Sequence, residues 1–199
     1  SGTAHGIESH GFRRLLWFNL LMTGHLDAIG AIKEDDRNLQ LLYFDARDLS
    51  FDDVGLSPRM LDSMLAVHGS HIEKLSDVLR WMLQRGFKIK LCIDRGRASE
   101  AGVHEFLTAI GTWPGFSVMA MPRSFEGNMH KKDLITPIAA LSGSANLTYS
   151  GSERNRETIA HVMRVNGTEY ESLAGGARTL FRNAIELDLD NIQPRIWRG

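Results

Sequence analysis

The sequence predicts an α/β protein with a mixed, largely parallel sheet flanked by helices. Short apolar runs alternate with amphipathic helical patterns between residues 39 and 121, an order typical of parallel strands joined by helices. Two short strand-like segments then follow at 130–136 and 138–142, joined tightly at Pro137. Such close spacing predicts an antiparallel hairpin, so we expect the sheet to be mixed.

The strand predictions rest on apolar runs that are too short for helices. Residues 39–44 are largely apolar and are followed by Asp45, as expected of a buried strand with a polar residue at its end. Residues 87–93 alternate at first and then become fully apolar, and residues 116–121 follow a turn. A further strand is predicted over 158–165.

The helix predictions rest on apolar residues at helical spacing and on cap signals. Ser57-Pro58 provides an N-cap with proline at the first helical position. Ser70 and Glu73 have the spacing of a capping box. The predicted helices lie over 10–23, between Ser57 and Gly69, between Ser70 and Gly86, over 99–110 and over 168–185, with a loop over 24–37.

Composition and charge exclude several classes of protein. The chain has 199 residues, of which 43% are hydrophobic and 24% are charged, so it can bury a core and is not intrinsically disordered as a whole. Cys92 is the one cysteine, which excludes an intrachain disulfide. The net charge is −1, so any nucleic-acid binding must come from a local basic patch. Residues 15–22 form the longest apolar run near the start, and it is too short to cross a bilayer. We therefore expect no membrane partner and a cytoplasmic location.

The residues that can carry chemistry are concentrated near the middle of the chain. His130 and Lys132 lie two apart in a predicted strand, so both point to the same face. Ser144 and Asn146 are also two apart, in a segment that can lie beside them. The four side chains offer an imidazole, an ammonium, a hydroxyl and an amide, a set that suits a phosphate. Glu157 can orient the imidazole through its second nitrogen.

Residues 128–157 resemble the phospholipase D superfamily, whose mark is His-x-Lys, then Asp, then Gly-Ser-x-Asn. His130-Lys131-Lys132 matches the first part and Gly143-Ser144-Ala145-Asn146 matches the last. Asn155-Arg156-Glu157 is similar to the downstream Asn-x-Glu of the family. The sequence departs from the pattern at the Asp, because position 137 holds proline and the interval to Gly143 is one residue short. We expect a tightened hairpin at this point, with the site retained.

The resemblance implies a phosphodiesterase that needs neither a metal nor another cofactor. His130 would attack phosphorus to form a phosphohistidine, a second histidine would protonate the leaving oxygen, and water would release the phosphate. Lys132, Ser144, Asn146 and Glu157 would complete the catalytic set. The side chains expected to bind the substrate around it are Lys131, Arg154, Asn155 and Arg156.

The number of motifs bears on the oligomeric state. The family needs two motifs for one active site, and none of the other histidines is followed two residues later by lysine. The resemblance therefore implies a homodimer with its site across a two-fold axis. We expect an N-terminal helical arm over 1–37 and a phospholipase D-like catalytic domain over 38–199.

Single-motif members of this size resemble bacterial nucleases, including those of restriction and phage-defence systems. This favours DNA or RNA as the substrate and a role in bacterial defence, with other subunits of a defence complex as potential partners. Two alternatives stay open. The first is a phospholipase-type lipid phosphodiesterase, and the second is a catalytically weak nucleic-acid-binding subunit of a larger complex.

Overall fold

The computed structural model describes residues 3–42, 46–50, 72–121, 132–143 and 156–191. The strands are β1 (Thr3–Glu8), β2 (Asn38–Leu42), β3 (Lys88–Ile93), β4 (Phe116–Ala120), β5 (Lys132–Ile135), β6 (Ala139–Gly143), β7 (Arg156–Met163) and β8 (Ile185–Glu186). The helices are α1 (Ser9–Ala28), α3 (Leu75–Gln84), α4 (Ala101–Ile110) and α5 (Gly167–Asn183), with short 3-10 turns at Glu34–Asp36 and Leu189–Asn191.

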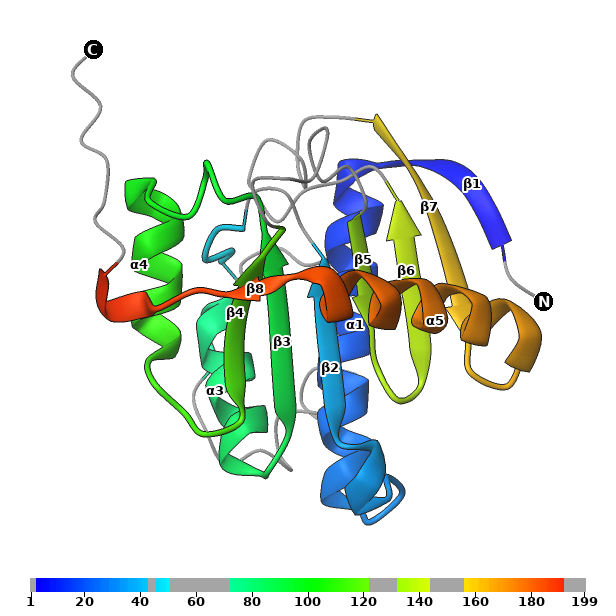
Figure 1. Cartoon of the computed structure of the whole chain (residues 1–199). Coiled ribbons are helices and arrows are strands. Elements are labelled where there is room, and N and C mark those ends of the chain that lie inside the picture. The colour runs from blue at the N-terminus through cyan, green and yellow to red at the C-terminus, as the bar shows by residue number, and fades with distance from the viewer. Residues whose placement is uncertain (1–2, 43–45, 51–71, 122–131, 144–155, 192–199) are drawn as a thin grey trace.

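Within these residues the strands form one sheet in the order β1-β7-β6-β5-β2-β3-β4-β8 (Figure 1). The mixed α/β class is confirmed. Parallel pairing is confined to β2–β3 and β3–β4, and the other neighbouring pairs among the described strands are antiparallel. The expectation of a largely parallel sheet therefore holds only for the part formed by β2, β3 and β4. The cause is the connections, because β3 reaches β4 through a helix whereas β5 reaches β6 through a tight turn.

The first 37 residues contribute a strand as well as the expected helix. Strand β1 pairs antiparallel with β7. Helix α1 buries Leu16, Trp17, Leu20 and Leu21 in the same core as β2 and β3. It continues to Ala28, through the start of the predicted loop over 24–37. The N-terminal segment is therefore part of the main sheet and its core.

Helix α3 begins later than its predicted capping box, so that prediction is wrong. The helix starts at Leu75, and the Asp77 carboxylate accepts hydrogen bonds at 2.9 Å from the backbone N–H groups of Glu73 and Lys74. A carboxylate in the first turn satisfies donors that the helix leaves unpaired. The helix predicted between Ser57 and Gly69 lies outside the described residues.

The two faces of the sheet carry separate apolar clusters. On one face the side chains of β2, β3 and β4 pack against α1, α3 and α4. On the other face a smaller cluster lies under α5 and includes Ile135, Ala140 and Val162. Figure 1 shows α5 crossing the front of the sheet, with α1 and α3 behind it. None of the helices in the described parts of the chain is long and apolar enough to cross a membrane.

A buried carboxylate joins the ends of the helices on the first face. Asp27 is 2% exposed and accepts hydrogen bonds from Arg37 Nε at 2.8 Å and from Arg85 Nε at 2.7 Å. The two guanidinium groups compensate the loss of hydration of the carboxylate. This ion-pair cluster fixes the end of α1 beside the end of α3.

Candidate active site

The described flanks of the motif converge at one end of the sheet. Lys132 begins β5 and stands opposite Gly143, the last residue of β6. Gly143 in turn stands opposite Ile159 of β7. Arg156 and Glu157 are the first two residues of β7 and pair with β1. The hairpin and the following strand therefore bring Lys132, Gly143 and the start of β7 to the same end.

The structure describes three of the predicted site residues through their place in the sheet, namely Lys132, Arg156 and Glu157. The remaining predicted site residues lie outside the described residues: His130, Lys131, Ser144, Asn146, Arg154 and Asn155. In the order of the chain, residues 122–131 connect β4 to β5, and residues 144–155 connect β6 to β7.

The parallel strands end at the same side. Leu42, the last residue of β2, pairs with Cys92 of β3 and with Asp133 of β5. In open α/β sheets the crevice beyond the carboxyl ends of the strands is the usual place for a ligand. Asp133 lies on β5 between β2 and β6 and is fully buried. Its carboxylate is therefore not exposed in this crevice.

Pro137 lies in the turn between β5 and β6, and the expected antiparallel hairpin is confirmed. Thr136 N–H donates to the carbonyl of Ala139 at 2.9 Å, and the Thr136 hydroxyl accepts from the N–H groups of Ile138 and Ala139. Proline suits the second position of such a turn. Five extended residues at about 3.3 Å each place position 137 roughly 16 Å from Lys132. The Asp-to-Pro departure therefore falls at the opposite end of the hairpin from Lys132.

A charged cluster that the sequence analysis did not single out lies near the ends of β2 and β3. Glu100, just before α4, accepts from Arg47 Nη2 at 2.8 Å and from Arg97 Nη1 at 3.0 Å. Position 102 is glycine, and a Cβ there would lie 1.7 Å from Arg47 Nη1. Arg47 and Glu100 are 53 residues apart, so no local pattern reveals their contact. The only local signal is the pair of arginines, Arg95 and Arg97, directly after a strand.

Burial shifts the pKa values of two other reactive side chains, those of Cys92 and His161. Burial raises the pKa of the Cys92 thiol to about 12, so the thiolate that would act as a nucleophile is strongly disfavoured. Burial also lowers the pKa of His161, whose Nε2 lies 3.3 Å from Asn19 Oδ1. Within the described part of the chain, no three His, Cys, Asp or Glu residues are grouped so that they could hold a metal ion.

No protein-family model matches the sequence, and no curated protein sequence is significantly similar to it. Solved structures are similar in fold. NucT from Helicobacter pylori has a TM-score of 0.54 at 12% identity, covering 94% of this chain and 99% of that chain. Nuc from Salmonella typhimurium, a phospholipase D family member, has a TM-score of 0.55 at 14% identity, covering 94% of this chain and 97% of that one. Polyphosphate kinase from Porphyromonas gingivalis has a TM-score of 0.56 at 13% identity, covering 92% of this chain but 26% of the kinase. The chain therefore has a phospholipase D-like fold, at low sequence identity.

Proposed function

We propose that this protein is a metal-independent phosphodiesterase that cleaves nucleic acid. The observation that carries the proposal is the register of Lys132 with Gly143, next to the start of β7. This register supports a meeting of the His-x-Lys, Gly-Ser-x-Asn and Asn-x-Glu segments at one end of the sheet. The similarity in fold to Nuc, a phospholipase D family member, supports the same chemistry.

The proposed reaction has two displacements at phosphorus. His130 attacks the phosphodiester, the bond to the leaving oxygen breaks, and a second histidine gives that oxygen a proton. The second histidine then takes a proton from a water molecule as that water attacks the phosphohistidine, the bond from phosphorus to nitrogen breaks, and His130 is regenerated. Lys132, Ser144 and Asn146 stabilise the charge on the phosphoryl oxygens. Glu157 positions the imidazole of His130.

A second copy of the chain completes the proposed site. The sequence holds one His-x-Lys motif, whereas the two-step mechanism needs a nucleophile and an acid. A C2 homodimer supplies His130 from each protomer to one shared site, because such an interface repeats every residue across the axis. The same motif then provides both groups.

Nucleic acid is the substrate that we favour. Lys131, Lys132, Arg154 and Arg156 lie within or beside the motif, and this local excess of cations suits a phosphate backbone. A role in bacterial defence, alone or with other subunits, is the biological setting that we propose for such an activity.

The test is cleavage of labelled single- and double-stranded DNA and RNA in the presence of EDTA. The wild type is expected to cleave at least one substrate, and His130→Ala is expected to cleave none. His104→Ala is the matched control, since His104 lies on α4 outside the motif and its loss is expected to leave cleavage unchanged. Quenching the wild type with alkaline denaturant is expected to trap an acid-labile, base-stable phosphoenzyme that His130→Ala lacks.

Three results would overturn the proposal. Cleavage that stops in EDTA and returns with a divalent metal would contradict the metal-independent mechanism. A folded dimer that binds DNA or RNA but cleaves nothing would identify a binding subunit, while hydrolysis of phospholipid vesicles alone would identify a lipid phosphodiesterase.

A further inference from the structure

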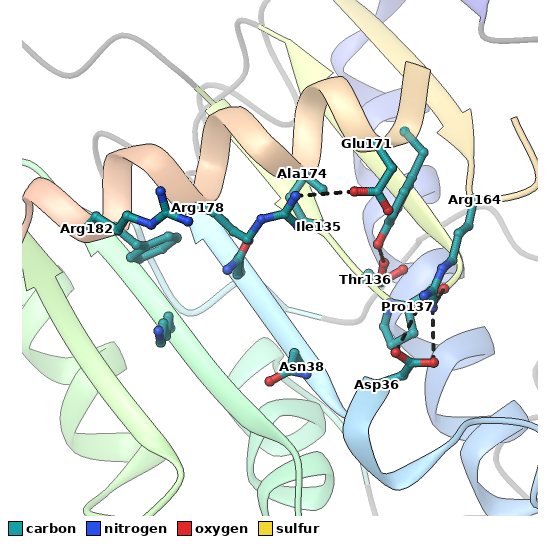
Figure 2. Close-up of a pocket in the computed structure, with 14 residues that line it drawn as sticks. Asp36, Asn38, Ile135, Thr136, Pro137, Arg164, Glu171, Ala174, Arg178 and Arg182 are labelled. Atoms are coloured by element: carbon teal, nitrogen blue, oxygen red, sulfur yellow. Dashed lines mark hydrogen bonds and ion pairs between the residues drawn. The ribbon is translucent and has the colours of Figure 1, made fainter. Parts of the chain in front are cut away.

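A polar groove lies between α5 and the sheet, at the end of the β5–β6 hairpin opposite Lys132 and Gly143. Its volume is about 460 Å³, within the range of roughly 300–1,000 Å³ that is typical of small-molecule sites. Asn38, the first residue of β2, and the turn residues Thr136 and Pro137 line one side (Figure 2). These residues lie at the opposite end of their strands from Leu42 and Lys132.

The groove exists because the sheet face changes from apolar to polar along one row of paired residues. Val162, Ala140 and Ile135 are in register on β7, β6 and β5, and they pack under α5. The row continues through Gln40 of β2 to Lys90 of β3. Both of these residues line the groove, so the sheet presents an amide and an ammonium to it.

Helix α5 supplies the other wall. Arg178 and Arg182 are four residues apart, so they lie on one side of the helix, and both line the groove. The buried residues Ala174 and Phe181 lie between them and the sheet and make the floor partly apolar. Figure 2 shows Arg182 near one end of the groove and Arg164 with Asp36 near the other.

The charges in the groove do not cancel. Four cationic side chains line it, Lys90, Arg164, Arg178 and Arg182, against the two carboxylates of Asp36 and Glu171, which leaves a net charge of +2.

The two carboxylates are already engaged. Arg164 pairs with Asp36 at 3.3 Å, and Arg178 pairs with Glu171 at 3.3 Å. Among the described residues, neither Lys90 nor Arg182 has a side-chain hydrogen bond or ion pair. The positive excess therefore lies where these two side chains approach the groove from opposite walls.

We infer that this groove binds a phosphate-bearing ligand about the size of a nucleotide. A dianionic phosphate matches the net charge of +2, and guanidinium groups bind phosphate oxygens through paired donors. The amide groups of Asn38 and Gln40 offer hydrogen bonds, and the apolar floor suits a ring. Binding here does not require the phosphodiesterase chemistry proposed above.

The test uses the full chain carrying His130→Ala and Lys132→Ala, so that the motif does not contribute to phosphate binding. Calorimetric titration is expected to show binding of pyrophosphate and ADP, and much weaker binding of adenosine. Adding Lys90→Gln and Arg182→Gln is expected to weaken both affinities by about tenfold or more, since each substitution removes a charged hydrogen-bond donor. Adding Lys88→Gln instead is the matched control, because Lys88 is exposed on the same strand but does not line the groove.

Further titrations identify the source of the phosphate. ADP binding indicates a free nucleotide, whereas binding of a 5′-phosphorylated single-stranded oligonucleotide, but not of ADP, indicates the end of a nucleic-acid chain. Failure of every phosphate compound to bind would overturn the inference. So would equal affinities in the Lys90→Gln/Arg182→Gln chain and the Lys88→Gln chain, provided that circular dichroism shows all chains to be folded. Cleavage assays on otherwise wild-type protein test the phosphodiesterase separately.

Discussion

Lys132 stands directly opposite Gly143 across the β5–β6 hairpin. The His-x-Lys and Gly-Ser-x-Asn segments thus flank the two open ends of one hairpin whose turn is closed by Thr136 and Pro137. The register of a hairpin is fixed by its turn. The short turn therefore decides which residues of the two motif halves face each other.

The first prediction concerns the two lysines of the motif. Lys132→Met is expected to lower kcat by about a hundredfold to a thousandfold, the usual effect of removing one group that stabilises developing charge. Lys131→Met is expected to act mainly on KM, because Lys131 is proposed to contact only the substrate backbone. Steady-state cleavage kinetics separate the two effects. Equal losses of kcat in both variants would contradict the assigned roles.

The second prediction tests the shared active site. After subunit exchange, an equal mixture of wild type and His130→Ala is expected to retain about 25% of wild-type activity, because a C2 site works only with both histidines. Independent sites in each chain would leave about half. The measurement is cleavage rate against mixing ratio, with sedimentation confirming the dimer. The same series with His104→Ala is the control and is expected to show no decline.

The third prediction concerns the contact between α1 and α3. A Cβ at Gly24 would lie 1.9 Å from Trp81 Cζ3, so Gly24→Ala forces the ring or the helix to move and is expected to cost about 1–3 kcal/mol. Gly167→Ala is the matched control, because Gly167 begins α5 and a Cβ built there meets no heavy atom within 4 Å beyond its chain neighbours and the adjacent backbone of its own helix. Its free energy of unfolding is expected to stay within about 1 kcal/mol of wild type. Urea unfolding measures both, and equal losses would show that the contact does not constrain α1.

Local sequence patterns predicted strands β3 and β4 and the β5–β6 hairpin. The apolar runs of β3 and β4 and the hairpin around Pro137 appear in the sequence within a few residues of their place in the structure. Strand β1 was missed because Thr3–Glu8 has no clear alternation and is held by pairing with β7 from the far end of the chain. The end of α1 was missed because Gly24 suggests a loop, whereas the ring of Trp81 occupies the space that a side chain would need.

The motif could be predicted from the sequence, whereas the groove under α5 could not, because only the motif is formed by residues close together in the chain. The motif is local, so its residues were found from the sequence. The residues of the groove come from distant parts of the chain, and no local pattern marks them. Lys90 is one of the exposed residues that alternate with buried ones along β3, and Arg182 occupies an exposed position on α5. Only the pairing of β2 with β3 and β5, together with the path of α5, brings these two cations to one cavity.

The last prediction concerns stability against pH. Burial lowers the pKa of His161 in the folded protein, whereas the unfolded chain has a histidine pKa near 6.5. Just below pH 6.5 the unfolded state therefore binds a proton that the folded state does not. The free energy of unfolding must then fall as the pH falls through this window. His161→Gln cannot titrate and is expected to lose less stability than wild type between pH 7.5 and pH 5 in urea unfolding.

His104→Gln, measured over the same pH range, is the comparison for removing another half-buried histidine, on α4. Because the Nε2 atom of His161 also lies 3.3 Å from Asn19 Oδ1, the comparison uses the change of stability with pH and not its absolute value. A wild-type slope in His161→Gln would show that other groups set the acid sensitivity. A reduced slope in His161→Gln alone would assign part of the acid sensitivity to the half-buried imidazole of His161.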